Sequence, residues 1–558
     1  MAEGIDNAAG EMAAQDVPTG TADRPLTTGA TKRSRRARWA WPAALAVAAV
    51  VLFLCYLRLA ATTPGNADGS DQALQAWDML HGNWLLRGWT VGDVSYYTTE
   101  LPEYIIVELI RGFGPGVIQV AAAITYTLLV LLVGLLAKGQ ATGREGVLRV
   151  LIASGILLAP QLGHGVSLLL SQPDHLGTQV PLLVIFIVVD RAPRRWYTPA
   201  ATALMLTWVI IADRVAVLDA ALPLVVVCGI RAFWALAHDR KRLASLWFEF
   251  SLMAAGIVSV GAAELTVSVI KHAGGYTSLP LPSQAAVVGD LPFHLRVTIQ
   301  GIATLYGAYF GGLTPGVAAA LAVVHLAGLA LALWGVCRAF RRFFSTSDLI
   351  VPVMATGIVL NLAAYAFSVV PATWFTAREI AAVLPFGAVL AGRMLGEPLA
   401  RARLQPVLVG PLACYALALG YGAGQPAPAD TEQPIVGWLE AHHLSTGLGT
   451  YTEANIITLD SGGRVAIRTV TWRASGAVPR AYESEASWYD PRLHYANFVV
   501  TNTADSGGAS LILPRDILAL AGPPARTYHY KTFTVMVWNH DLLADLGGPP
   551  SANPGDVA

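Results

Sequence analysis

The stretch Lys32–Ala61, KRSRRARWAWPAALAVAAVVLFLCYLRLAA, joins a basic cluster to an apolar run long enough to cross a bilayer. The apolar part, from Trp39 to about Ala61, is longer than the apolar core of a cleaved signal peptide, although Ala60-Ala61 resembles a cleavage site. Basic residues favour the cytoplasmic side of a membrane helix. We expect an uncleaved anchor behind a disordered, basic cytoplasmic N-terminus (residues 1–38), and a cleaved signal peptide is the alternative.

The composition indicates a membrane protein. Of the 558 residues, 54% are hydrophobic and only 13% are charged, whereas a soluble domain carries about 25% charged residues. Further apolar stretches of spanning length centre near residues 126, 158, 184, 204, 222, 257, 325, 360, 387 and 413. The sequence therefore predicts a polytopic α-helical membrane protein with about eleven transmembrane helices over residues 39–422.

Basic residues recur in every second connection between these spans, as the positive-inside rule requires. The clusters fall at residues 32–38, 138–149, 191–195, 240–242, 338–342 and 393–403. The pattern predicts a multi-pass protein of the plasma (inner) membrane with its N-terminus in the cytoplasm and its C-terminus outside. Two of the outside connections are long, residues 62–113 and 271–314, so we expect structure to be built on that face.

The composition becomes polar and rich in β-forming residues after Ala423. We expect residues 423–545 to form a small α+β extracytoplasmic domain, with a loose tail over residues 546–558. The elements expected are a helix at Ile435–His443, a hairpin of Asn455–Leu459 with Arg464–Trp472, and strands at Asn497–Thr503 and Tyr528–Trp538.

The first outside loop contains DGSDQALQAWDMLHGNW (68–84) and TELPEY (99–104). An acidic residue after a first span, a short amphipathic helix ending in a Gly-Asn-Trp turn and a Pro-containing entry to the next span resemble the first periplasmic loop of GT-C type glycosyltransferases. Within that class the loop is most similar to the protein O-mannosyltransferases and the lipid A aminoarabinose transferases. It departs from them in carrying Asp71-Gln72 in place of an acidic pair, and Thr-Glu-Leu-Pro in place of Lys-Pro-Pro.

The resemblance implies a GT-C-like fold and a polyprenyl-phosphate sugar donor, and it assigns roles to residues in three loops. It implies that Asp71 is the base that activates the acceptor, although an Asp here can also cap the following helix. It places Asp174 and His175 in the site, unless they are solvated loop residues. It assigns the donor phosphate to Arg378, for which anchoring at the membrane interface is the alternative.

Other features are less defined. Glu100 and Glu103 flank the entry to the second span, where one of them can face the substrate cavity that the resemblance implies. A divalent metal held by Asp71, Asp174 and His175 is possible, but their spacing matches no ligand motif, and no other cofactor is indicated. The chain has no nucleotide-binding Gly-rich loop and no His-Glu-x-x-His, so ATP-driven transport and zinc proteolysis have no support, and nothing suggests a nucleic-acid partner.

Together these features predict a membrane glycosyltransferase. It would move a sugar from a polyprenyl-phosphate donor to a glycan, lipid or protein acceptor of the cell envelope on the extracytoplasmic face, in contact with membrane lipids. The alternative is a non-catalytic GT-C relative, or a transporter of envelope lipids or glycans. A transporter should show repeated broken helices in two halves, and the acidic residues here gather in the outside loops instead.

Overall fold

The computed structural model describes residues 30–238, 246–280, 284–427, 433–473, 476–502 and 514–547. The chain divides into two units, residues 1–50 and 51–558. Helix α1 (Ala30–Ala60) begins in the first unit and ends in the second. Residues 30–38 are therefore helical, which differs from the expected disorder, and the rest of the expected N-terminal segment lies outside the described residues.

The described part of the chain is mostly helical, and the multi-pass membrane architecture is confirmed. The helices at the expected spans are α1, α4 (Val117–Lys138), α5 (Gly143–Leu157), α7 (Asp174–Arg191), α8 (Tyr197–Ala212), α9 (Leu222–His238), α10 (Trp247–His272), α12 (Val317–Arg341), α13 (Ile350–Ala366), α14 (Val383–Arg401) and α15 (Val409–Ala423). Among the described residues, six helices are long and apolar enough to cross a membrane, or up to eight if two bent pairs each count as one span.

The bent pairs contain two residues expected in the site, Asp174 and Arg378. Helix α6 (His164–Leu170) meets α7 at 60°, and the 3₁₀ helix η4 (Trp374–Ile380) meets α14 at 59°. Pro173 lies in the first break, where a residue without an N–H cannot continue the helical hydrogen bonds. The span expected near residue 158 corresponds to α5, which ends at Leu157, and to α6, which begins at the exposed His164.

Small residues let the membrane helices approach closely. A Cβ atom added at Gly335 of α12 would lie 2.9 Å from the backbone N of Ala391 in α14. One added at Gly392 of α14 would lie 2.7 Å from the carbonyl oxygen of Arg149 in α5. Close backbone packing of this kind is how helices associate where lipid supplies no hydrophobic drive between them.

The two long loops that are expected outside do carry structure. The first contains α2 (Ala67–Leu80), β1 (Trp89–Val91) and α3 (Glu100–Arg111), and the second contains β2 (Thr277–Ser278), the 3₁₀ turn η3 (Val288–Asp290) and α11 (Leu291–Leu305). Strand β1 pairs with β2 in parallel and with β6 (Ser484–Glu485) of the C-terminal region in antiparallel orientation. Both loops are therefore joined to the C-terminal region through one small sheet.

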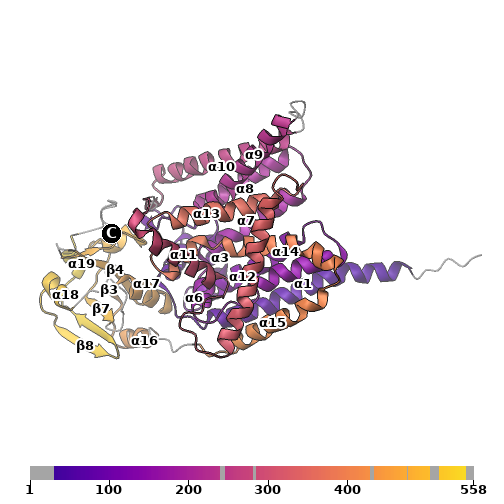
Figure 1. Cartoon of the computed structure of the whole chain (residues 1–558). Helices are drawn as coiled ribbons and strands as arrows, with labels where there is room; N and C mark the ends of the chain where they lie inside the picture. The colour runs from indigo at the N-terminus through magenta and orange to yellow at the C-terminus, as the bar shows by residue number, and fades with distance from the viewer. Residues whose placement is uncertain are drawn as a thin grey trace, which may run out of the picture. The chain divides into compact units, whose positions relative to one another are not determined.

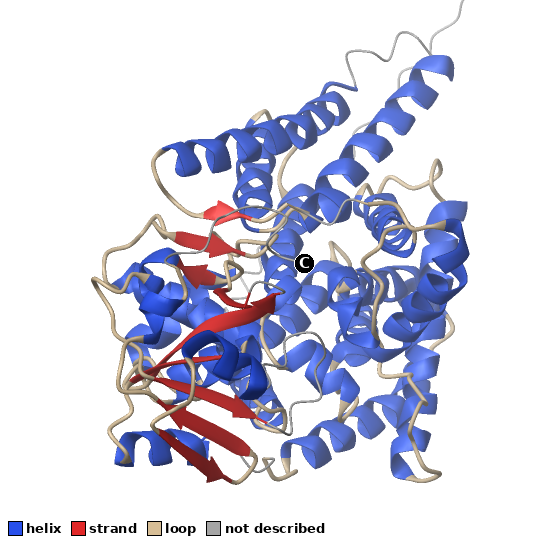
Figure 2. Ribbon diagram, turned by 90° about the vertical axis from the view of Figure 1, so that its left-hand side faces the viewer, coloured by secondary structure: helices blue, strands red, loops and turns tan. Residues whose placement is uncertain are grey.

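The C-terminal region is built on a six-stranded sheet of order β5-β4-β3-β7-β9-β8. Figure 1 shows β3, β4, β7 and β8 grouped with α16 to α19, and Figure 2 shows the strands gathered together and flanked by helices. The strands are β3 (Thr446–Gly449), β4 (Ala466–Arg473), β5 (Gly476–Pro479), β7 (Phe498–Asn502), β8 (Arg526–Tyr530) and β9 (Phe533–Val537). The helices are α16 (Gln433–Ala441), α17 (Tyr451–Asp460), η6 (Ala486–Tyr489), α18 (Pro514–Ala521) and α19 (Leu542–Asp545).

The hairpin expected at Asn455–Trp472 is wrong. Residues 455–459 belong to helix α17, which connects the parallel strands β3 and β4. The run Asn-Ile-Ile-Thr-Leu is almost wholly buried, with Ile457 at 0% exposure, so its apolar character does not distinguish a strand from a buried helix. The helix at residues 435–441 and the strands at 466–473 and 498–502 agree with the expectation. The single strand expected at Tyr528–Trp538 is instead a hairpin, because the chain turns at residues 531–532 between the antiparallel strands β8 and β9.

Both faces of this sheet are buried, because alternate residues of each strand point to opposite sides. Phe498 and Val500 pack with Ile435 and Ile457 on the face covered by α16 and α17. Val499 packs with Met536, Leu542 and Leu543 on the face covered by α19. The region therefore has its own core, as a small α+β domain requires.

Candidate active site

The N-terminus of α2 is fixed against the break between α6 and α7. Asn66 caps α2 by accepting a hydrogen bond from the backbone N–H of Gly69 at 2.7 Å. Its side-chain amide donates to the carbonyl oxygen of Ser171 at 2.9 Å. The cap of this helix is thus Asn66 and not Asp71, and the contact places the first turn of α2 beside the start of α7.

Arg378 in η4 is held between two carboxylates from that junction. Its Nη1 lies 2.7 Å from Oδ2 of Asp68 in α2 and 3.3 Å from Oδ2 of Asp174 in α7. The side chain of Arg378 remains 26% exposed, so it is paired but not fully enclosed. Asp174 is held further by the hydroxyl of Tyr96 and by Nε2 of Gln172 at 3.0 Å. An arginine and an aspartate expected from the sequence therefore do lie in contact.

His175 lies behind this pair and is buried among acidic groups. Its Nδ1 is 2.7 Å from Oδ2 of Asp213, and its Nε2 is 3.1 Å from Oε2 of Glu379. Asp213 does not pair with its neighbour Arg214, which instead lies 3.1 Å from Glu264 of α10. The arrangement of Asp213, His175 and Glu379 links the C-terminal end of α8 to the residue that follows Arg378.

Asp71 occupies a different position from Asp68, although both lie on α2. Its side chain is fully buried, it accepts a hydrogen bond from Gln75, and its Oδ1 has no partner among the described residues. Burial raises the pKa of Asp71 well above its usual range, and the nearby Asp68 raises it further. The structure brings Asp174, His175 and Arg378 together with Asp68, and Asp71 lies one helical turn behind them.

The C-terminal domain contributes two side chains to this cluster. The hydroxyl of Tyr451, the first residue of α17, lies 2.8 Å from Oδ1 of Asp68 and also contacts Glu483. Burial raises the pKa of Glu483 well above its usual range, and Asp71 and Asp68 add to the effect. A protonated Glu483 can donate to the Tyr451 oxygen while Tyr451 donates to Asp68, so the three groups form one chain of hydrogen bonds.

Glu100 and Glu103 make their contacts apart from Arg378. Glu100 is fully buried beneath Gly177, where it contacts Thr99 and accepts a hydrogen bond from Thr178 at 3.2 Å. Glu103 accepts from Thr125 of α4 at 2.6 Å and lines a separate, mainly apolar cavity. Burial raises the pKa of Glu103 to about 7. Among the described residues, neither glutamate contacts Arg378 or its partners Asp68 and Asp174.

A cavity of about 340 Å³ lies beside the cluster and includes Glu379 in its wall. Asp93, Arg214 and Asn361 supply polar groups to it, and Leu218, Ala364 and Val370 supply apolar ones. Burial raises the pKa of Asp93, and the charge of Glu379 raises it further. Within the described ranges, no three His, Cys, Asp or Glu side chains are arranged to hold a metal ion.

Sequence reasoning missed Asp68, Glu379, Asp213 and Tyr451. Asp68 lies three residues before Asp71, and this spacing alone indicated that the two share a helical face. Glu379 directly follows the predicted Arg378. The positions of Asp213 and Tyr451 follow only from how distant segments pack, because His175 and Asp213 are 38 residues apart and Asp68 and Tyr451 are 383 apart.

Comparison with known proteins supports the fold. No family model matches the sequence, and no curated protein matches it. ArnT from Cupriavidus metallidurans in the apo state is 13% identical, and the match covers 92% of this chain and 100% of ArnT with a TM-score of 0.51. The same protein bound to undecaprenyl phosphate is 14% identical, with coverages of 91% and 99% and a TM-score of 0.48.

The apo oligosaccharyltransferase of Archaeoglobus fulgidus is more distant in structure. It is 13% identical, with 82% of this chain and 69% of that chain covered and a TM-score of 0.44. At such identities the likeness concerns the fold. The chain therefore has a GT-C-like fold, and this is the class that its first outside loop resembles.

Proposed function

We propose that this protein is a glycosyltransferase that moves a sugar from a polyprenyl-phosphate donor to an acceptor of the cell envelope. The reaction would take place on the extracytoplasmic face of the inner membrane. The observation that carries the proposal is Arg378, a partly exposed guanidinium held between Asp68 and Asp174 where two bent helix pairs meet. A guanidinium so placed suits a lipid phosphate, because its planar donors match phosphate oxygens.

The proposed step needs one base and one anion site. The acceptor oxygen or nitrogen attacks the anomeric carbon and forms the new glycosidic bond, while the bond from that carbon to the donor phosphate breaks. The acceptor proton passes to a carboxylate, and the polyprenyl phosphate leaves with the bonding electrons. Arg378 stabilises the developing phosphate charge.

Asp68 is the carboxylate best placed to be that base. It is partly exposed, with 26% of its side chain accessible, and it touches both Arg378 and Tyr451. Asp71, which the family resemblance assigns to this role, is fully buried and bonded to Gln75. We propose that Asp71 supports α2 and the Glu483–Tyr451 contact, and that Asp174 and His175 position Arg378 and Glu379.

Transfer of radiolabel from a panel of polyprenyl-phosphate sugars, in membranes carrying each variant, tests the proposal. Asp68→Asn should abolish transfer, and Asp71→Asn should reduce it only in part. Asp290→Asn, an exposed carboxylate of the second long loop, is the control and should behave as wild type. If Asp71→Asn abolished transfer while Asp68→Asn remained active, the base would be Asp71. Absence of transfer from every donor would favour the alternative, a non-catalytic relative or a transporter of envelope lipids or glycans.

A further inference from the structure

A second polar cavity lies at the opposite end of the membrane helices from Arg378. Helix α7 begins at Asp174 beside Arg378 and ends at Arg191, which lines this cavity. Its 18 residues correspond to about 27 Å of helix. The cavity has a volume of about 590 Å³ and is lined by residues of the connections that the charge pattern places in the cytoplasm.

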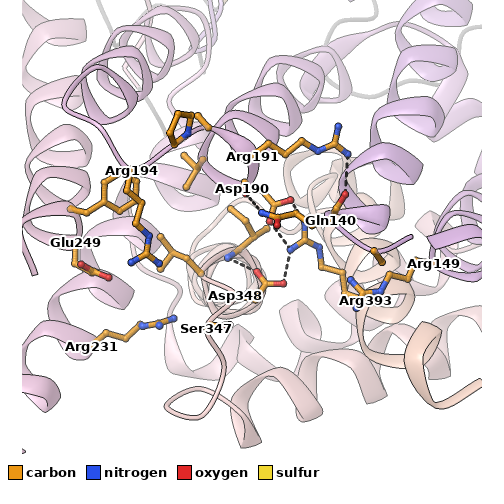
Figure 3. Close-up of a pocket in the computed structure, with 18 of the residues that line it drawn as sticks. Gln140, Arg149, Asp190, Arg191, Arg194, Arg231, Glu249, Ser347, Asp348 and Arg393 are labelled. Atoms are coloured by element: carbon orange, nitrogen blue, oxygen red, sulfur yellow. Dashed lines mark hydrogen bonds and ion pairs between the residues drawn. The ribbon is translucent and has the colours of Figure 1, made fainter. Parts of the chain in front are cut away.

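One group of charges in the cavity is already paired. Arg393 of α14 is buried and lies 2.9 Å from Asp190 and 2.6 Å from Asp348, and it also donates to the carbonyl oxygen of Leu136. Figure 3 shows this group in the middle of the cavity. Arg393 therefore ties α14 to α4, α7 and the start of α13, and its side chain, only 2% exposed, is not accessible to a ligand.

The other end of the cavity carries two arginines without such partners. Arg231 of α9 donates from Nη2 to the carbonyl oxygen of Thr346 at 3.1 Å, but its Nη1 is buried and has no hydrogen-bond partner among the described residues. Arg194 lies with its guanidinium carbon 5.6 Å from the ring centre of Phe248, and no described carboxylate pairs with it. Figure 3 shows both side chains at the same end of the cavity.

Glu249 lies at this end too, and its Oε2 is buried without a partner among the described residues. Arg194, Arg231 and Glu249 together carry a net charge of one positive unit. The first turns of α10 and α13 also line the cavity, and helix N-termini favour negative charge. A buried donor without an acceptor is costly, so a ligand that supplies oxygen atoms to Arg231 would relieve that cost.

We infer that this cavity binds a singly charged phosphate group, with Arg194 and Arg231 as its ligands. A phosphate offers planar arrays of oxygen to two guanidinium groups, and one negative charge matches the local excess. The group can belong to the headgroup of an anionic phospholipid, since basic pockets between membrane helices on the cytoplasmic side accept such headgroups. It can equally be the monoanion of free phosphate from solution, which offers the same oxygen atoms and the same single charge.

The test uses the full-length protein in nanodiscs of phosphatidylcholine, with thermal unfolding as the readout. One arm raises the fraction of phosphatidylglycerol, whose phosphodiester carries a single negative charge. The other arm adds inorganic phosphate to discs of phosphatidylcholine alone. A saturable rise of the unfolding temperature in the first arm alone assigns the site to a lipid. A rise in the second arm alone assigns it to a soluble phosphate, and a rise in both shows that the phosphate group suffices.

Variants decide whether the effect comes from this cavity. Arg194→Gln with Arg231→Gln should weaken binding by about tenfold or more in whichever arm responds. Arg341→Gln with Arg342→Gln removes the same charge from exposed positions on the same end and should leave binding unchanged. Glu249→Gln should strengthen binding, because it removes the competing carboxylate. This variant tests the site independently if the double variant folds poorly. The assignment would be overturned if the wild-type protein bound in neither arm. It would also be overturned if the two double variants and Glu249→Gln all bound equally well.

Discussion

At the scale of single residues, the candidate active site depends on how Arg378 is shared. Asp68 and Asp174 come from separate helices, and each touches the same Nη1 atom. Arg378→Lys keeps the charge but loses the planar donor array that can hold two carboxylates and a phosphate together. We expect kcat/KM for transfer to fall by roughly 10- to 100-fold, while the protein remains folded. Kinetics with the active donor checks this, and unchanged kinetics would remove Arg378 from phosphate binding.

Glu103 gives a pH dependence of stability. Its pKa is raised from 4.5 to about 7 in the folded protein, so the folded state binds one more proton than the unfolded state between these values. Stability contributed by this group is therefore highest below pH 4.5 and declines as the pH rises to about 7, by at most about 3 kcal/mol. Unfolding temperatures at pH 5 and pH 8 should differ less for Glu103→Gln than for wild type. An equal difference in both proteins would contradict the prediction.

At the scale of elements, helix packing in the membrane region depends on glycine. A Cβ atom at Gly335 would lie 2.9 Å from the backbone of α14, which no side-chain rotation can relieve. Gly335→Ala should force α12 and α14 apart and lower stability by about 1–3 kcal/mol. The matched control is Gly261→Ala in α10, where nothing lies within 4 Å of the added atom. Thermal unfolding of the two purified variants checks this, and equal unfolding temperatures would contradict it.

Helix α17 shows what local pattern cannot decide. Its buried apolar run is compatible with either a strand or a helix, and the helix forms because it connects the parallel strands β3 and β4. Its first residue, Tyr451, thereby reaches Asp68. Tyr451→Phe should lower transfer by roughly 10- to 100-fold, since one hydrogen bond to a charged group contributes about 1.5–3 kcal/mol. Measuring transfer and unfolding temperature together distinguishes this from a loss of folding, and full activity would exclude Tyr451 from the site.

At the scale of the whole molecule, the pairing of β1 with β6 joins the first outside loop to the C-terminal domain. Thr90 is the antiparallel partner of Ser484. Cysteines at both positions, in a protein lacking the four natural ones, should form a disulfide without added oxidant if both face an oxidising compartment. The control pairs Thr90→Cys with Thr527→Cys in edge strand β8 and should stay reduced. Failure of the first pair to oxidise would contradict the pairing or the proposed outside location.

The sequence by itself determined the multi-pass architecture, most helix positions, the presence of structure in the two long loops and several strands of the C-terminal domain. These follow from local signals, namely apolar length, charge placement and alternation along a strand. It also pointed to Arg378, Asp174 and His175. Only the tertiary structure decided that Asp68 rather than Asp71 contacts Arg378, and that Asp213, Glu379 and Tyr451 join them. The physical reason is that such contacts depend on the orientation of helices far apart in the chain, which one segment does not encode.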